Sequence, residues 1–337
     1  MSMTDKEKFI NGIIHKSASE VMKLKHTLRK NKKKDWYCCF PNCSNKAINS
    51  HLLQRNGVLD RISENGHVIS FIELPKPPSQ QRFKFGRVGL KEALSYPVFC
   101  NHHDTTIFRS IEERKIDLAN KWDNLLLAYR STTTERRKKE IRKRVNEKII
   151  KGILEGYTEF PDYALNAIRK TISQLQYEID KNKSDEFKLG QFLNRKTCVD
   201  GFEQYTFIIK IIPICSASVF SFFDKSAKEN IRVPIFFNLI PNKNYTFCSF
   251  GWFKEDSPLL RKFQKKLFSG GIKNLFKIIS DILCTKIENW VVNPSFYTEY
   301  LEEQESIIFD YFSNSHLYKH VDTVIEFNMF EAYLEEL

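Results

Sequence analysis

The sequence predicts an α+β protein with a small metal-binding region, a helical middle region and a C-terminal domain built from a sheet and helices. Three observations support this prediction. Cysteines and histidines gather in two short stretches, 38–51 and 100–103. Apolar residues recur at helical spacing between about 105 and 185. After residue 201, β-branched and aromatic runs alternate with turn residues. A chain of 337 residues is long enough for two or three modules.

The N-terminal segment, residues 1–35, is expected to be a basic amphipathic helix. Its apolar residues Phe9, Ile13 and Val21 recur at roughly helical spacing among many lysines. The stretch MSMTDKEKFINGII lacks the order of a signal peptide, and no apolar run is long enough to span a bilayer. We therefore expect a cytoplasmic protein that does not enter a membrane.

The net charge of +12 predicts a polyanionic partner. Lysines crowd the first 34 residues, a second basic block, TERRKKEIRKRVNEK, covers 134–148, and the chain after Tyr297 is mostly acidic. Nucleic acid, DNA in preference to RNA, is the expected partner, because neutralised phosphates release counterions. The candidate contacts are Lys32, Lys33, Lys34, Arg136, Arg137 and Lys138. The alternative for the second block is a solvated helix face, since glutamates interleave with its basic residues.

Residues 36–115 form the expected metal-binding module, an irregular region with short β-prone pieces such as HVISFIEL and a PKPPSQQ loop. Cytoplasmic cysteines are reduced, so closely spaced cysteines favour a metal over disulfides. The first ligand pair is Cys43 with either Cys38 or Cys39. Cys100 and His103 follow at the i, i+3 spacing of a helix start. Three thiolates and one imidazole predict a structural Zn²⁺ site.

Residues 116–195 are expected to be a helical region in which two or three helices double back on one another. The pattern begins at about residue 105, and turn signals lie near STTT and near EGYTEFPDY. Such a hairpin would bury the shared apolar stripe of its helices.

Residues 196–337 are expected to be an α+β C-terminal domain. The runs YTFIIKIIPICS, SVFSFF, RVPIFFNLIP and YTFCSFGWF predict strands. The stretch from Leu259 to Val292 is helix-like, is interrupted at Gly270 and Gly271, and is stopped by an Asn-Pro pair. The isolated Cys198, Cys215, Cys248 and Cys284 are expected to be buried core thiols. We find neither a phosphate-cradling glycine loop nor a nucleophile elbow.

Two further residues of the metal-binding module, His51 and Asp104, complete a pattern that resembles a known family. His51 ends the β-prone KAINSH, and Asp104 directly follows His103. Together with the paired cysteines, the pattern "C…C…AINSHLLQ…GHV…FCNHHDTTIF…IE" resembles the HNH, or ββα-metal, nucleases built on a treble-clef zinc finger. It also resembles zinc-containing modules of bacterial proteins, several from phage-defence settings. The resemblance covers about 38–115 and favours Cys38 over Cys39 as a ligand, because four residues separate the first two cysteines of that pattern.

The resemblance implies a role for each residue. His51 would be the general base that deprotonates water. Asp104, and His102 beside it, would hold a catalytic Mg²⁺ or Mn²⁺, while the zinc stays structural. Ser50 stands where the family has an acidic ligand, and Asp104 where it has histidine. The alternatives are that His51 is buried or a further zinc ligand, and that Asp104 is a helix N-terminal carboxylate.

Two functions follow. The first is a metal-dependent nuclease that acts as an effector in bacterial anti-phage defence. The second is a non-catalytic, zinc-stabilised nucleic-acid-binding or scaffold subunit. In either case the C-terminal domain is where we expect a partner defence protein, or a second copy of the chain, to bind.

Overall fold

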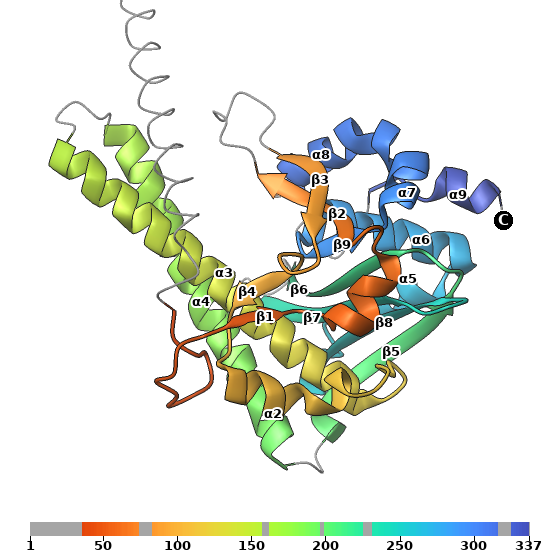
Figure 1. Ribbon diagram of the computed structural model, residues 1–337, viewed down its shortest axis with the longest axis horizontal. Helices are drawn as coiled ribbons and strands as arrows, with labels where there is room; N and C mark the ends of the chain where they lie inside the picture. Colours follow the sequence, from red (N-terminus) through yellow and green to blue (C-terminus); the bar gives the residue numbers. More distant parts are fainter. Residues whose placement is uncertain are drawn as a thin grey trace, which may run out of the picture.

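The protein is described by a computed structural model that covers residues 36–73, 83–156, 162–195, 199–224, 231–315 and 325–336 (Figure 1). The expected N-terminal helix with Lys32, Lys33 and Lys34, the PKPPSQQ loop and Cys198 lie outside the described residues.

The helices and strands alternate along the chain as a mixed α and β architecture. In chain order they are β1 Asn49–His51, η1 Arg55–Leu59, η2 Asp60–Ile62, β2 His67–Glu73, β3 Phe83–Gly89, β4 Ser95–Pro97, α2 Asn101–Glu112, α3 Lys121–Gly156, α4 Asp162–Arg195, η3 Val199–Gly201, β5 Phe202–Ile209, β6 Ile214–Asp224, β7 Ile231–Pro241, β8 Thr246–Phe253, η4 Lys254–Asp256, α5 Arg261–Phe268, α6 Gly271–Asp281, η5 Ile282–Lys286, β9 Trp290–Val292, α7 Pro294–Phe296, η6 Tyr297–Leu301, η7 Glu302–Gln304, α8 Glu305–Ser313 and α9 Glu331–Glu335. The η elements are short 3₁₀ or π-helical turns. The expected α+β fold class is therefore confirmed at this level.

The central feature is a seven-stranded antiparallel sheet with the strand order β3-β2-β9-β6-β7-β8-β5. Strands β5 to β8 correspond to the four apolar runs expected to be strands. The first of these runs is divided, because the chain leaves the sheet between Ile209 and Ile214. A smaller two-stranded sheet pairs β1 with β4, with Ser50 opposite Tyr96 and His51 opposite Ser95.

The metal-binding region is not a separate domain. Its strands β2 and β3 join the large sheet through β9, where Ile69 pairs with Val292. The expected boundary at residue 115 therefore divides a continuous sheet. Strand β9 was itself expected to be the end of a helix, and this was wrong. Trp290, Val291 and Val292 are fully buried between two neighbouring strands, and such a strand carries no polar alternation that would mark it in the sequence.

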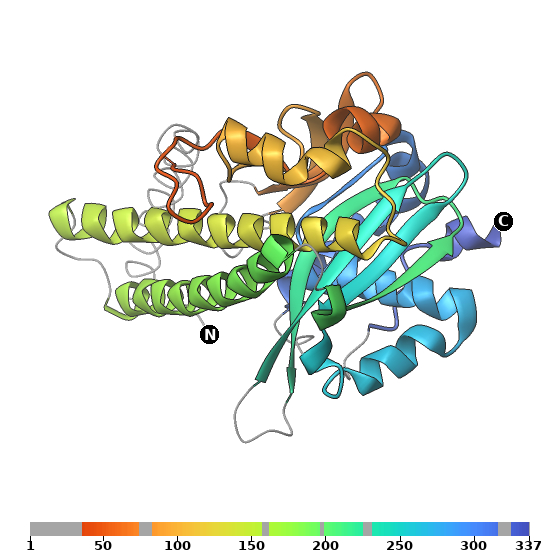
Figure 2. The ribbon, with the colours of Figure 1, turned by 90° about the horizontal axis from the view of Figure 1, so that it is seen from below.

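The large sheet has a hydrophobic core on each face. Neighbouring residues of the strands point to opposite faces, so Phe237 belongs to one core and Phe236 to the other. Figure 2 shows α5 and α6 on one side of the sheet and α2 and α3 on the other. The second core extends to Cys38 and Cys100, so the expected metal ligands border the packing of the whole molecule.

Helices α3 and α4 form the expected hairpin, which extends beyond the edge of the sheet (Figure 2). No turn interrupts α3 at the STTT stretch, contrary to expectation. Thr133 and Thr134 are buried, and each hydroxyl donates to the carbonyl oxygen four residues earlier. Because these hydroxyls form their hydrogen bonds within the helix, the threonines do not interrupt it, and the STTT stretch does not mark a turn. The break lies earlier, at 113–120, where Asn120 caps α3 by accepting from the Trp122 amide.

The break at Gly270 and Gly271 is confirmed. Both residues have positive φ angles, 77° and 64°, which are left-handed values that other residues rarely adopt. Within the part of the chain that the structure describes, no helix combines the length and the apolar character needed to cross a membrane.

Candidate metal centre and the adjoining His51–Asp104 site

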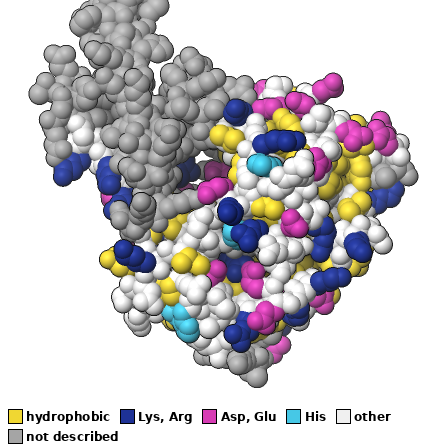
Figure 3. All heavy atoms as spheres, in the orientation of Figure 1, with side chains coloured by type: hydrophobic (Ala, Val, Ile, Leu, Met, Phe, Trp, Pro, Cys, Tyr) yellow, Lys and Arg dark blue, Asp and Glu magenta, His cyan; other side chains and the backbone are white. Residues whose placement is uncertain are grey.

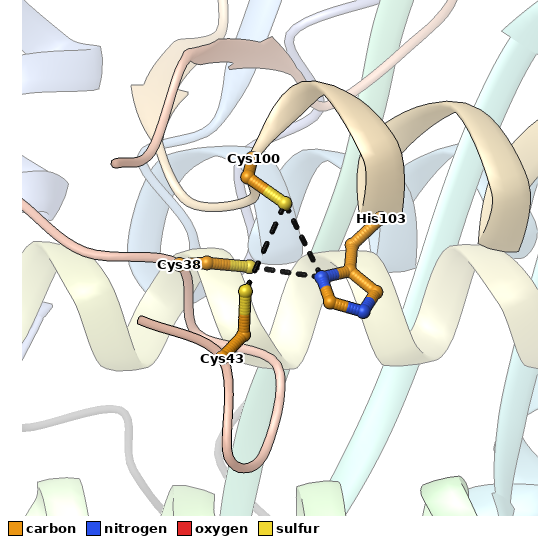
Figure 4. A group of neighbouring side chains, drawn as sticks. All are labelled: Cys38, Cys43, Cys100 and His103. Carbon is orange, nitrogen blue, oxygen red and sulfur yellow. Dashed lines mark hydrogen bonds between the residues drawn. The ribbon is translucent and has the colours of Figure 1, made fainter. Parts of the chain in front are cut away.

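A tight loop before β1 carries the first two expected ligands. The Cys38 amide donates to the Asn45 carbonyl oxygen at 2.8 Å, and the Cys43 amide donates to that of Phe40 at 3.2 Å. Tyr37 and Lys46 close the loop through an antiparallel bridge. This folding brings two side chains five positions apart in the sequence to one side of the loop (Figure 4).

The second pair lies at the start of α2. Cys100 is the residue before the helix, and its carbonyl oxygen accepts from the Asp104 amide at 2.9 Å. His103 is three residues further on, so both side chains share one face of the first turn. Phe99 is fully buried and anchors this end of the helix in the core.

The four ligand atoms lie within 4.8 Å of one another (Figure 4). Nδ1 of His103 is 3.5 Å from Sγ of Cys38 and 3.3 Å from Sγ of Cys100, and Sγ of Cys43 is 3.9 Å from that of Cys100. A tetrahedral zinc would separate two sulfur ligands by about 3.8 Å and a sulfur from a nitrogen by about 3.5 Å. The cluster could therefore hold a metal ion, and its spacing and donor atoms are compatible with zinc.

Phe40 supports the imidazole of this cluster. Its ring stacks on that of His103 with centroids 4.0 Å apart and an angle of 18° between the planes. Burial lowers the pKa of His103, which favours the neutral form that a metal ligand requires. The ligand loop and α2 thus contact each other through apolar packing as well as through the ligands.

Cys39 is separate from the cluster, as expected. Its sulfur accepts a hydrogen bond from Arg137 at 2.8 Å, and its amide donates to the Val98 carbonyl oxygen. Burial raises the pKa of its thiol. The other described cysteines, Cys215, Cys248 and Cys284, are fully buried in the cores, as expected for structural thiols.

His51 lies at the end of β1 with a defined ring orientation. Its Nε2 is 2.9 Å from the Leu90 carbonyl oxygen. A carbonyl oxygen can only accept, so Nε2 carries the proton of this hydrogen bond and Nδ1 of the neutral ring is left as an acceptor. His51 is not part of the four-residue metal cluster.

Asp104, in the first turn of α2, is near enough to His51 at the end of β1 for the two side chains to interact electrostatically. Burial raises the pKa of its carboxyl, and the charge of Arg130 opposes this rise. A hydrogen bond with Ser50 and the proximity of His51 also lower the pKa of Asp104, whereas Glu112 raises it. The structure therefore brings together the two residues that the sequence singled out, although they are 53 positions apart.

Arg130 of α3 lies against the same site, and the sequence analysis did not identify it. Its guanidinium is 3.5 Å from Asp104 Oδ1 and 2.6 Å from Glu112 Oε1, and it lies 4.0 Å above the Phe108 ring. The side chain is only 2% exposed. One sequence signal could have identified it, because an arginine that interrupts the apolar run LLLAYR falls on the buried stripe of the helix.

The other two histidines of the region are exposed. The ring centroid of His102 lies 5.1 Å from that of His103, and His102 is outside the metal cluster. His67 is on β2, and its Nδ1 contacts the Asn65 carbonyl oxygen at 2.7 Å. Figure 3 shows a histidine with basic and acidic side chains on the face of the molecule between β1 and α2.

The expected nucleic-acid contacts in α3 are largely buried. Arg136 forms an ion pair with Glu186 at 2.6 Å, and Arg137 donates to the Tyr37 carbonyl oxygen. Arg136 and Arg137 are 8% and 5% exposed. Lys138 forms an ion pair with Glu135 at 2.7 Å, and its side chain is 13% exposed. Arg136 joins α3 to α4, Arg137 joins it to the ligand loop, and Lys138 joins it to Asn289 before β9. The assignment of these residues to a nucleic-acid surface therefore does not agree with their burial.

Comparison with known proteins identified no relative. No family model, no curated protein and no solved structure matches the chain.

Proposed function

We propose that the protein is a metal-dependent nuclease of the HNH type, with a structural zinc in the Cys38, Cys43, Cys100 and His103 cluster. The single observation that carries the proposal is that His51 and Asp104, 53 positions apart in the sequence, come close enough to interact electrostatically. The pairing of β1 with β4, which α2 follows in the chain, supports the proposal of a ββα unit; β2 and β3 lie between the two strands in the sequence. An effector role in anti-phage defence belongs to this proposal through the sequence resemblance alone.

In this proposal His51 is the general base. Its Nε2 proton is bound to the Leu90 carbonyl oxygen, so Nδ1 accepts the proton of the attacking water and the ring becomes an imidazolium. The Leu90 carbonyl oxygen also fixes the orientation of the ring. Asp104 of α2 is within electrostatic reach of this imidazole.

A hard divalent cation such as Mg²⁺ or Mn²⁺ would be held by oxygen ligands, of which Asp104 and Ser50 are the ones beside His51. Bound there, the cation would neutralise charge on the phosphate and the leaving oxygen. His102 can serve as an additional ligand only at the exposed edge of the site. Four protein ligands leave the zinc no open position, so its part is to hold the loop to α2.

The test is cleavage of plasmid DNA and of RNA by purified protein with Mg²⁺ or Mn²⁺. His51→Ala should fold, retain one zinc and lose activity by about a hundredfold or more. His67→Ala is the matched control, because that histidine also contacts a backbone carbonyl oxygen but lies on β2. Equal loss of activity in both variants, or undiminished activity in His51→Ala, would refute the general-base assignment.

A second candidate function is favoured by Arg130. Its guanidinium already pairs with Asp104 and Glu112, as expected of a zinc-stabilised binding or scaffold protein that does not hold a catalytic cation. Arg130→Met separates the two functions. If the nuclease proposal holds, freeing Asp104 should tighten Mn²⁺ binding beyond the zinc equivalent. If the wild type binds nucleic acid with a steep salt dependence, never cleaves it, and neither protein binds Mn²⁺, the scaffold function is supported.

A further inference from the structure

A polar cavity of about 320 Å³ lies where the α3–α4 hairpin meets the large sheet. Its walls come from α3, α4, β6, β7 and the segment from η5 to Glu288, which are far apart in the sequence. Figure 2 shows the hairpin beside the projecting ends of β6 and β7. The cavity is distinct from the candidate metal centre, since none of the four metal ligands, His51 or Asp104 lines it.

Cations predominate among the charged side chains of this cavity. Five basic side chains line it: Lys138, Lys139, Arg142, Arg232 and Lys286. Three carboxylates line it: Glu135, Glu178 and Glu288. Two of these cations already pair with carboxylates that do not line the cavity, Arg232 with Asp185 at 2.6 Å and Lys286 with Asp281 at 3.6 Å. The basic side chains left to attract a phosphate are therefore those of α3.

Two of these cations are held only loosely by carboxylates across the cavity. Lys139 is 3.5 Å from Glu178, and Arg142 is 3.9 Å from Glu288. Both distances exceed a normal charge-assisted hydrogen bond, and the Arg142 side chain is 60% exposed. Arg142 can therefore turn toward a phosphate without breaking a short ion pair. Lys139 also donates to Glu135 at 3.1 Å, so it has one short ion pair on α3 itself and only the long one across the cavity.

Two further groups of the lining suit a ligand larger than a bare anion. Nδ2 of Asn182 is buried and has no hydrogen-bond partner among the described residues, although Oδ1 accepts from Arg232 at 3.0 Å. An unpartnered buried amide is costly unless a ligand or water satisfies it. Tyr177 of α4 is 46% exposed at the rim, and its ring offers a surface for stacking.

We propose that this cavity binds a small phosphorylated ligand with an aromatic ring, the chemical class to which nucleotides belong. Lys139 and Arg142 hold the phosphate, Asn182 Nδ2 donates to the ligand, and the ring stacks on Tyr177. The volume is at the lower end for small-molecule sites, which agrees with a mononucleotide. This proposal does not depend on nuclease activity.

The cavity wall is joined by hydrogen bonds to the two-stranded β1–β4 sheet. Lys138 Nζ donates to Asn289 Oδ1 at 2.9 Å, and the Tyr96 hydroxyl donates to the same oxygen at 3.3 Å. Tyr96 of β4 pairs with Ser50 of β1. Asn289 and Tyr96 thus link Lys138 to the strand that pairs with β1.

The experiment is isothermal titration calorimetry of the zinc-loaded full chain with AMP, inorganic phosphate and adenosine. We expect AMP to bind with a Kd of about 1 mM or tighter, phosphate to bind more weakly and adenosine not to bind. The double variant Lys139→Gln/Arg142→Gln should weaken AMP binding by about tenfold or more. Lys143→Gln, on the same helix but outside the lining, is the control and should not change it.

Two variants sharpen this test. Glu178→Gln removes a carboxylate that competes for Lys139, so it should tighten AMP binding several-fold. Tyr177→Ala should weaken AMP binding and leave phosphate binding unchanged. Hydrogen exchange of the wild type with AMP should show protection in 135–142 and 282–288, which locates the site even if a variant fails to fold.

Several results would overturn the proposal. The first is that neither AMP nor phosphate binds at about 10 mM, well above a millimolar Kd. The second is that AMP binds the folded double variant as tightly as the wild type. The third is that AMP protects only segments away from the cavity from hydrogen exchange.

Discussion

The buried guanidinium of Arg130 in α3 lies 3.5 Å from the Asp104 carboxylate in the first turn of α2. The same group contacts Glu112 at 2.6 Å, so one arginine ties both ends of α2 to the long helix. The position of the Asp104 carboxylate, and the charge around it near His51, therefore depend on α3.

Arg130→Met should lower the free energy of unfolding by about 2 kcal/mol, because Asp104 and Glu112 lose their buried partner and Phe108 loses its cation–π contact. Urea unfolding at pH 7 measures this change. The matched control is Arg109→Met in α2, which removes an ion pair between Arg109 and Glu113. The side chains of this pair are 64% and 70% exposed. The control should change the stability by less than about 0.5 kcal/mol. Similar losses in the two variants would mean that the Arg130 pairs contribute little.

Cys38→Ser and Cys39→Ser should differ in metal content although the two residues are neighbours. Cys38 supplies a ligand sulfur to the cluster, whereas the Cys39 sulfur accepts from Arg137. We expect about one zinc per chain in the wild type and in Cys39→Ser, and loss of zinc in Cys38→Ser. Elemental analysis after dialysis against a weak chelator measures the zinc content per chain. The opposite pattern would exchange the roles of the two cysteines.

Removing the metal should loosen the ligand loop first. The loop 36–48 is held to α2 by the cluster, by the Phe40–His103 stack and by a few hydrogen bonds, whereas the sheet has its own cores. After chelation, we expect amide exchange to accelerate by at least about tenfold in 36–48 and in the first turn of α2. Exchange in β6 and β7 should change little. Uniform acceleration along the chain would show that the metal supports the whole fold instead.

Glu135→Gln should be strongly destabilising. Its carboxylate, with the side chain 15% exposed, accepts from Lys138, Lys139 and Asn289, and these partners hold the pKa of Glu135 well below its usual range although burial opposes this. Loss of the charge leaves buried lysines without their main partner, at a cost of about 3 kcal/mol. Glu147→Gln is the control, since that residue forms an i, i+4 pair with Lys143 and is 47% exposed. Thermal unfolding should separate the two variants by several degrees.

Asp256→Asn should stabilise the protein at neutral pH. Burial raises the pKa of Asp256 from its ordinary 3.8 to about 6, so the folded state disfavours the charged form. The penalty is fully present above about pH 6, shrinks as the pH falls, and disappears below the unfolded-state pKa of 3.8, where the carboxyl becomes protonated in both states. The group is partly exposed, so we expect a gain of about 1 kcal/mol at pH 7.5. Urea unfolding at pH 7.5 and 4.5 should show the advantage shrinking at the lower pH, and an equal gain at both would exclude this cause.

Much of the architecture was predictable because its signals are local. The ligand pairs were identified from spacing and residue type, since a thiolate pair and an i, i+3 helix start need no distant information. The strands β5 to β8 and the break at Gly270 and Gly271 were equally readable. The helical hairpin followed from apolar periodicity, although the STTT stretch was misinterpreted because hydroxyl groups that mark turns in loops bond within a helix.

The sequence by itself determined which side chains could hold a metal, and it identified His51 and Asp104 as candidate residues of a second site. Only the tertiary structure decided what surrounds them. Strand β9 joins β2 to the large sheet, Arg130 reaches Asp104 from α3, and the basic block of α3 faces Glu135 and Glu186 instead of solvent. Of that basic block, the buried part is Arg136 and Arg137, whereas the Arg142 side chain is 60% exposed. The physical reason is that metal-ligand chemistry is set by residue type, whereas the partner and burial of a charge depend on elements far away in the chain.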